Sequence, residues 1–499
     1  MMTELNHEPV LTTDFNSKTS LWRGLALVLL GWLVAFFVKN DGIFSRRIQI
    51  DIIGPNPSLV NDMPYLGSVL LILAGLLLIF LVGLAIKSGS IDRVVLGMFA
   101  FSLNADVVPM LFQISLIGFC YILVDRGLRQ RRIPFRLTPM VVLLGLMMLS
   151  YSVSFLQTTQ PLSLMSNMIY RSTYMLSVVL LPALLVSRRH LDTLFDFMLV
   201  AAIITVGAEI AQYILTAMSG RIITFSPGSY NHVVTPFGIM PRLTGLMYHP
   251  NHQSNILATQ AVMALWFSLQ PKGTINRRRR MFLFAGYVIL AFGTVVTMSR
   301  SGWLSIAIAT ALVPLIRFKK VAPWYFLTVV GVCLLAYTTG LAEAGYKLVH
   351  DINGDSADFR WHIDDIALEA FFSRPWFGVG TSNFLDFFNP YQLEVHDTYL
   401  QIASGMGIFG ILIFGGYILA VITRLIHVAL TPASPAYREW AIALLFGLMI
   451  TGIQSFFAMF LWIKFLWGVF GIAEAVIMNN RDKKYRPSPN DFIFLPPQR

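Results

Sequence analysis

Long apolar runs recur along this chain and limit its possible folds more than any other feature. A helix needs about 20 mostly apolar residues to cross the hydrocarbon core of a bilayer. One longer stretch, 93–124, is interrupted by Asn104 and Asp106, and it predicts a hairpin of two short helices whose polar tip faces outward. With this hairpin, the windows predict an all-α integral membrane protein of about 14 transmembrane helices. The other windows are 21–38, 66–86, 138–157, 167–187, 194–216, 254–270, 281–298, 302–316, 324–342, 399–423, 439–457 and 460–479.

Composition excludes the soluble alternatives. Of 499 residues, 56% are hydrophobic and 13% are charged, which leaves too little polar surface to cover two or three soluble domains. A soluble nucleic-acid binder is therefore excluded. The net charge of +11 has a simpler cause, because Lys and Arg gather in the cytoplasmic loops of membrane proteins. Cys120 and Cys333 both lie in apolar runs, so we expect neither a disulfide framework nor a thiolate metal site.

The distribution of charge predicts the orientation. With the N-terminus inside, the basic clusters at 126–136, 277–280 and 317–320 all fall in cytoplasmic loops. Residues 343–397 instead hold ten Asp or Glu against three Lys or Arg, as an outward loop does. The predicted parts are cytoplasmic tails at 1–20 and 480–499, membrane helices at 21–216, 254–342 and 398–479, and outward loops at 217–253 and 343–397.

The two outward loops are too long to be simple connectors. Both are rich in aromatic residues, which argues against disorder. We expect short helices that lie on the outer face and pack into a cap over a cavity.

His396 is the candidate base. It opens the segment His396-Asp397-Thr398-Tyr399, just before the chain enters the membrane. A histidine at a water-facing helix start beside a carboxylate can take a proton from a hydroxyl near neutral pH. The alternative is an interfacial residue that only hydrogen-bonds a loop. Gly405, Gly407 and Gly410 follow and predict a close helix contact or a tight bend near the site.

Three arginines are candidate anion ligands. Arg300 lies in a short break between two spans at the outer edge, and Arg242 precedes the span at 254–270. Arg360 is the third, although Asp358, Asp364 or Asp365 could pair with it. A guanidinium at this depth is costly unless it meets an anion, and its planar fork suits phosphate oxygens. The three predict a lipid-linked pyrophosphate ligand, and the alternative is snorkelling of each side chain to the lipid headgroups.

Two metal sites are minority hypotheses. His249 and His252 are spaced for one helix face, but no third ligand lies nearby in the sequence. Asp364 and Asp365 resemble an acidic pair that holds a divalent cation, but adjacent helical side chains point apart. We expect no metal.

Three ordered blocks resemble the O-antigen ligase and polymerase superfamily (WaaL and Wzy-like proteins). They are Arg242-Leu243-Thr244-Gly245 with Pro250-Asn251; Ser299-Arg300-Ser301-Gly302; and Phe377-Gly378-Val379-Gly380 leading to His396-Asp397-Thr398-Tyr399-Leu400 and Gly407-Ile408-Phe409-Gly410. The resemblance covers about residues 200–425. One departure is Asp397, where the family motif usually has Asn, Ser or Gln; the change either raises the basicity of His396 or marks a subfamily.

The resemblance implies an inverting, metal-independent glycosyltransferase of the integral-membrane GT-C type, without a cofactor, in the bacterial inner membrane. Its donor would be a glycan on undecaprenyl pyrophosphate at the periplasmic face. Arg242 and Arg300 would hold the pyrophosphate, and His396 would activate the acceptor hydroxyl. Arg360, Asp397 and Asn251 are candidate supporting residues. A flippase and a chain-length regulator are candidate partners.

The acceptor divides the family. A polymerase extends a second lipid-linked repeat unit, whereas a ligase transfers the glycan to lipid A-core. Chain length and the Phe377–Gly380 block favour an exopolysaccharide or O-antigen polymerase, with the ligase as the alternative. A transporter of lipid-linked glycans is the alternative from another class. It is disfavoured because the polar groups gather at the outer helix ends, with Glu209, Gln212 and Lys464 as exceptions.

Overall fold

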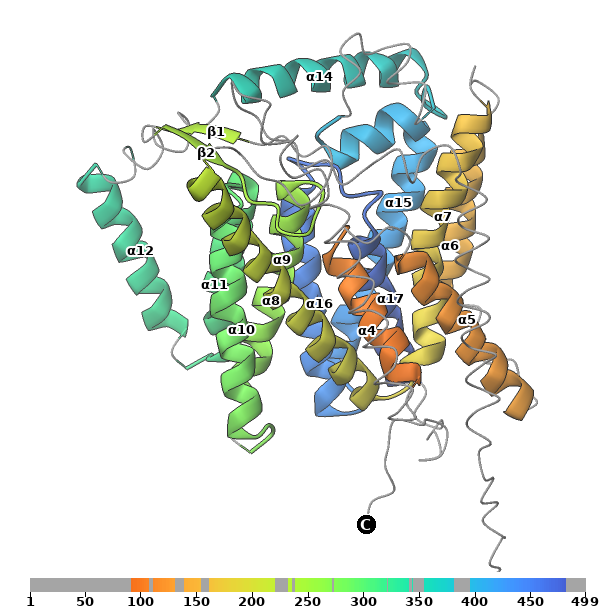
Figure 1. Cartoon of the computed structure of the whole chain (residues 1–499), viewed down its shortest axis with the longest axis horizontal. Helices are drawn as coiled ribbons and strands as arrows, with labels where there is room; N and C mark the ends of the chain where they lie inside the picture. Colours follow the sequence, from red (N-terminus) through yellow and green to blue (C-terminus); the bar gives the residue numbers. More distant parts are fainter. Residues whose placement is uncertain are drawn as a thin grey trace, which may run out of the picture.

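The computed structural model describes residues 91–106, 111–130, 139–153, 161–219, 232–235, 238–271, 273–320, 322–340, 343, 354–380 and 395–481. Nearly all of them are helical (Figure 1). The helices are α4 Ile91–Asn104, α5 Leu111–Gln130, α6 Pro139–Val153, α7 Pro161–Leu184, α8 Arg188–Ser219, α9 Pro250–Ser268, α10 Arg277–Val296, α11 Arg300–Arg317, α12 Ala322–Thr338, α14 Gly354–Ser373, α15 Thr398–Leu430, α16 Pro435–Gln454 and α17 Lys464–Arg481.

Each apolar window within the described residues coincides with a helix. The stretch 93–124 is divided into α4 and α5, and the break begins after Asn104 as predicted. Four helices, α8, α10, α15 and α16, are long and apolar enough to cross a membrane, and five shorter apolar helices accompany them in the described part. The windows at 21–38 and 66–86, and both predicted tails except residues 480 and 481, lie outside the described residues. The total of about 14 helices and the GT-C-like arrangement remain predictions.

Helices α9 and α17 form the centre of the bundle. Every residue of α9 except His252 is buried, and α9 packs against α8, α10, α11 and α16. Helix α17 is buried along almost its whole length against α7, α15 and α16. Inside lipid, the hydrophobic effect contributes little to the association of helices. Close packing and interhelical hydrogen bonds hold such a bundle together instead. Examples are Gln260 Nε2 to Asn104 Oδ1 at 2.6 Å and Gln454 Nε2 to Ser305 Oγ at 2.8 Å.

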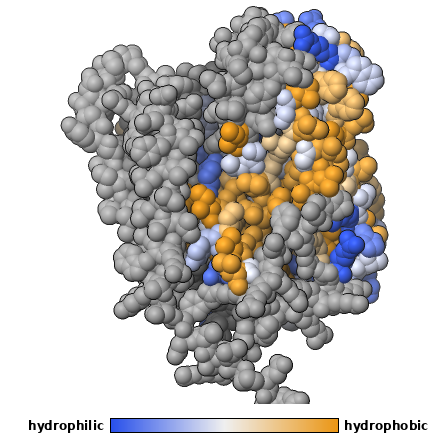
Figure 2. All heavy atoms as spheres, turned by 90° about the vertical axis from the view of Figure 1, so that its right-hand side faces the viewer, coloured by the Kyte–Doolittle hydropathy of each residue, from blue (hydrophilic) through white to orange (hydrophobic). Residues whose placement is uncertain are grey.

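The outer helices turn apolar side chains away from this centre. Large exposed hydrophobic residues lie along α6, α10 and α12. Examples are Leu149, Phe292 and Leu334. Figure 2 shows apolar side chains over much of the height of one face, with hydrophilic groups towards its upper and lower ends. An apolar surface between polar ends is what a helical bundle presents to a bilayer. The protein is therefore a helical multi-pass membrane protein.

The two long loops differ from the expected short helices. The first loop contains a two-stranded antiparallel hairpin, β1 His232–Thr235 and β2 Gly238–Pro241, so the fold is not purely α-helical. In its described part, the second loop contains α14, a helix of 20 residues. Both elements lie at the same end of the bundle, where α14 runs across the helix ends (Figure 1). Periodicity could not predict the hairpin because each strand has only four residues.

Basic residues gather at the opposite end. Arg279 pairs with Asp196 at 3.0 Å, which joins the start of α10 to α8. Arg317, at the end of α11, pairs with Glu439 near the start of α16 at 2.8 Å. The predicted cytoplasmic cluster at 277–280 and Arg317 of the cluster at 317–320 therefore share one end, and which side of the membrane that end faces remains a prediction.

Candidate functional site

Arg242 is held in the loop between β2 and α9. Its side chain is 7% exposed. Its Nη2 donates to Asn251 Oδ1 at 2.8 Å and its Nε donates to the Thr297 carbonyl at 3.3 Å. Both acceptors are neutral, so the guanidinium keeps its charge without a carboxylate partner among the described residues. Its remaining N–H groups can bind an anion.

Asn251 links this loop to the next candidate arginine. Its Oδ1 also accepts a hydrogen bond from Ser299 Oγ at 3.1 Å, so one amide oxygen joins Arg242 to the start of α11. Met298, the residue before Ser299, has a φ of 53°. This value lies in the left-handed region that residues other than glycine rarely occupy. This strained break separates α10 from α11 and sets Arg300 at the first position of α11.

The three candidate arginines lie close enough to influence one another. Burial, then the positive charges of Arg360 and Arg300, lowers the pKa of Arg242 to about 10. Burial and the charge of Arg300 also lower the pKa of Arg360, against the opposing effect of Asp364. Both guanidinium groups stay protonated at neutral pH. A concentration of like charge in a low-dielectric setting is unfavourable until an anion enters it.

His396 lies beside this cluster at the start of α15. Its charge contributes to the lowered pKa of His249, after burial, His252 and Arg242. The neighbouring Thr398 fixes the start of α15, since its Oγ1 donates to the Ala458 carbonyl at 2.8 Å and accepts from Phe460 N at 2.9 Å. His396, Arg242 and Arg360 therefore all lie near enough to His249 to influence its pKa, and their role in one site remains a prediction.

A backbone crossing holds the segment after α14 against α15. Val379 N donates to the Ser404 carbonyl at 2.8 Å, and Ile408 N donates to the Pro375 carbonyl at 2.8 Å. Gly378 and Gly407 have φ values of 69° and 65°. A Cβ on either glycine would clash with the backbone of the other segment at this crossing. The bend predicted from the glycines is confirmed at Gly407, where α15 is interrupted.

His249 caps α9. Its Nδ1 accepts a hydrogen bond from Asn251 N at 3.1 Å. Burial first, then the cationic neighbours, lowers the pKa of His249 well below its usual value, so the ring is neutral at pH 7. Its ring stands 5.3 Å from that of His252. Among the described residues, no three His, Cys, Asp or Glu side chains converge as metal ligands do.

Sequence reasoning passed over an ion pair beside the site. Lys464 Nζ lies 2.7 Å from Asp106 Oδ1 and donates to the Ala105 carbonyl at 2.8 Å. Asp106 Oδ2 accepts from Tyr248 N at 3.3 Å, so the α4–α5 break supports the loop that ends at His249. The signal was present, because an acid and a lysine inside two apolar stretches are partners to look for.

Asp397 is the N-cap of α15. Its Oδ1 accepts from Tyr399 N at 2.6 Å and from Leu400 N at 2.9 Å. Burial raises the pKa of Asp397, and these two hydrogen bonds oppose the rise. Asn and Ser, two of the three residues that the related motif usually has here, are equally good caps. The departure from the motif therefore preserves a helix cap.

We expect Asp397→Ala to lower the free energy of unfolding by about 1 kcal/mol through loss of the cap, and Asp397→Asn to leave it nearly unchanged. Thermal unfolding of the purified variants in one detergent measures this. An equal loss of stability in both variants would contradict the capping role.

The comparisons with known proteins agree with the resemblance. The family model described as O-antigen ligase matches residues 285–415. The matched segment runs from α10 to the first half of α15 and contains Arg300, Arg360 and His396, whereas Arg242 and Asn251 precede it. No curated protein matches the chain. The match confirms the resemblance to the O-antigen ligase and polymerase superfamily over this segment, and it supports a glycosyltransferase-like role in glycan assembly.

Proposed function

We propose that this protein is a polymerase that joins undecaprenyl-pyrophosphate-linked repeat units at the periplasmic face of the bacterial inner membrane. The reaction is an inverting glycosyl transfer without a metal. The observation that carries the proposal is the convergence of Arg242, Arg300 and Arg360 beside His396 at the end of the bundle that α14 crosses. A cluster of cationic side chains with an adjacent base suits a substrate that has a pyrophosphate leaving group and a nucleophilic hydroxyl.

In the proposed step, the acceptor hydroxyl oxygen attacks the anomeric carbon of the donor sugar. The bond from that carbon to the pyrophosphate oxygen breaks, and undecaprenyl pyrophosphate leaves with the electron pair. His396 takes the hydroxyl proton. Arg242 and Arg300 offset the charge that develops on the leaving oxygen, and Asn251 keeps Arg242 oriented through its Oδ1.

Two alternative functions would use the same cluster of arginines and His396 but give different products. A ligase would transfer the glycan to lipid A-core, and a transporter would use the arginines to line a passage. The buried position of Arg242 and its two oriented hydrogen bonds favour a fixed binding site over a passage.

The deciding experiment reconstitutes the purified protein in liposomes with an undecaprenyl-linked oligosaccharide. We expect stepwise lengthening of the lipid-linked glycan. Product only on added lipid A-core would identify a ligase, and movement of the intact substrate without any new glycosidic bond would identify a transporter.

Activity in this assay is expected to survive a strong chelator. If Arg242 and Arg300 neutralise the pyrophosphate, no cation is needed to stabilise the leaving group. The measurement is product formation with EDTA, followed by magnesium, manganese or zinc. Loss with EDTA and recovery with one metal would overturn this mechanism and direct attention to Asp364, whose pKa burial and the charge of Asp397 raise to about 6.

A further inference from the structure

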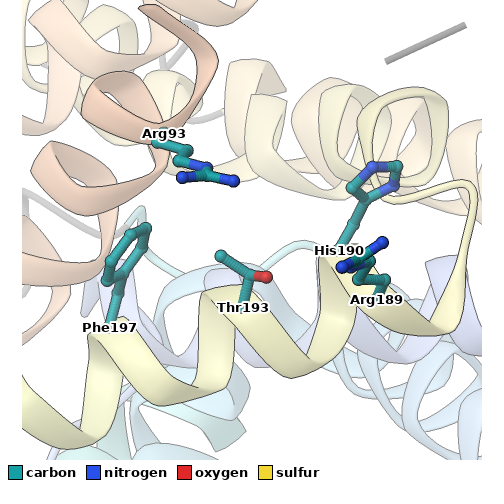
Figure 3. Close-up of a pocket in the computed structure, with 5 residues that line it drawn as sticks. All are labelled: Arg93, Arg189, His190, Thr193 and Phe197. Atoms are coloured by element: carbon teal, nitrogen blue, oxygen red, sulfur yellow. The ribbon is translucent and has the colours of Figure 1, made fainter. Parts of the chain in front are cut away.

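A cavity opens between the start of α4 and the first three turns of α8, at the opposite end of these helices from the arginine site. Its volume is about 180 Å³. Arg93 projects from α4 towards α8, while Arg189, His190, Thr193 and Phe197 come from α8 (Figure 3). The lining thus combines two guanidinium groups, an imidazole and a hydroxyl with one aromatic ring. Nothing in the proposed glycosyl transfer uses this cavity.

Two acidic residues of α8 near this cavity, Asp192 and Asp196, are engaged by other groups. Asp192 pairs with Arg188 at 3.3 Å and also accepts from Trp440 Nε1 at 3.0 Å. Asp196 pairs with Arg279 at 3.0 Å. Arg189 makes no ion pair with any described residue. The charge of Arg189 is therefore not neutralised by a carboxylate of the described residues.

The helix dipole of α8 adds to this charge. Arg189 and His190 lie in the first turn of α8, which contains no acidic residue. His190 is 4% exposed, and Ser187 Oγ lies 3.0 Å from its Nδ1, so the ring is fixed. Cations at a helix N-terminus are unfavourable, and a bound anion relieves that cost.

We propose that this cavity binds a phosphate group. The planar forks of Arg93 and Arg189 suit phosphate oxygens, and Thr193 supplies a hydroxyl donor. The phosphate can belong to a phospholipid headgroup or to a free phosphate ion. The aromatic wall at Phe197 and the position at the end of two membrane helices fit a headgroup, because basic pockets between such helices recognise anionic lipids.

Thermal unfolding of the full-length protein in detergent tests the proposal, because a ligand that binds the folded state raises the unfolding temperature. The probes are phosphatidylglycerol against phosphatidylcholine of the same acyl chains, and sodium phosphate against sodium chloride at equal ionic strength. We expect saturable stabilisation by phosphatidylglycerol and none by phosphatidylcholine. Stabilisation by sodium phosphate as well would support the site and identify free phosphate as a second source.

The variants are Arg93→Gln and Arg189→Gln, both at exposed positions where folding tolerates the change. Each is expected to raise the apparent Kd for phosphatidylglycerol by about tenfold or more. The matched control is Arg278→Gln, which removes one exposed charge at the same end of the bundle outside the cavity. An equal weakening in Arg278→Gln, or no stabilisation of the wild-type protein by either phosphate probe, would overturn the proposal.

Discussion

His396→Ala is expected to lower the rate of glycan polymerisation by about 10² to 10⁴, because general-base catalysis typically contributes that much. The variant should still insert into the membrane and bind the lipid-linked donor, since Thr398 and Asp397 rather than His396 fix the start of α15. Polymer yield in cells and single-turnover rates in liposomes measure the effect, with donor binding measured separately.

His427→Ala is the matched control. His427 is exposed near the far end of the same helix, so its loss should leave polymer synthesis unchanged. His396→Gln keeps a hydrogen-bonding side chain without a base and should be as inactive as the alanine variant. Wild-type polymer yield from His396→Ala, at matched expression, would remove His396 from the mechanism.

A second histidine, His249, lies near Arg242, but its surroundings argue against a role as the base. Its Nδ1 already accepts from Asn251 N, and burial first, then the neighbouring positive charges, lowers the pKa of the ring. A base that is hard to protonate is a weak acceptor for the proton of a hydroxyl. His249 instead holds the start of α9, beside the amide that orients Arg242.

The helices could be predicted from sequence because the bilayer imposes a physical length on them. Each window within the described residues contains a helix. The break at Asn104 and the bend at Gly407 were also predictable, since polar residues and glycines interrupt apolar helices for known reasons. These features depend on residues that are neighbours in sequence.

The contacts that build the site depend on packing, and sequence could not predict them. Arg242, Asn251 and Ser299 come from three separate segments, and their shared hydrogen bonds arise only from how α9 and α11 pack. The pairing of Gly378 with the Gly407 break is equally non-local. The capping role of Asp397 could be predicted locally, because Asp, Asn and Ser are all preferred N-caps. The sequence alone also allowed the interpretation that Asp397 raises the basicity of His396.

Arg242→Lys and Arg300→Lys are expected to keep part of the donor affinity and lose most of the rate, whereas Arg→Ala at either position should lose both. Lysine keeps the charge but lacks the bidentate fork. Removing one oriented donor from a developing oxyanion typically costs a factor of about 10² to 10³. At Arg242 the lysine also loses the bonds to Asn251 and Thr297 that aim the side chain, so its rate should fall further than at Arg300.

Headgroup snorkelling predicts a different pattern for the same variants. A snorkelling side chain keeps its charged end in the wet interface, where lysine replaces arginine easily. Arg242 is too buried for this, so the distinction matters most at Arg300, which is partly exposed. Arg374→Ala, at an exposed position that follows α14, is the matched control and should be near wild type. Separate measurements of donor Kd and single-turnover rate for all five variants distinguish the two roles, and mild, equal effects of Lys and Ala at Arg300 would assign that residue to the headgroups.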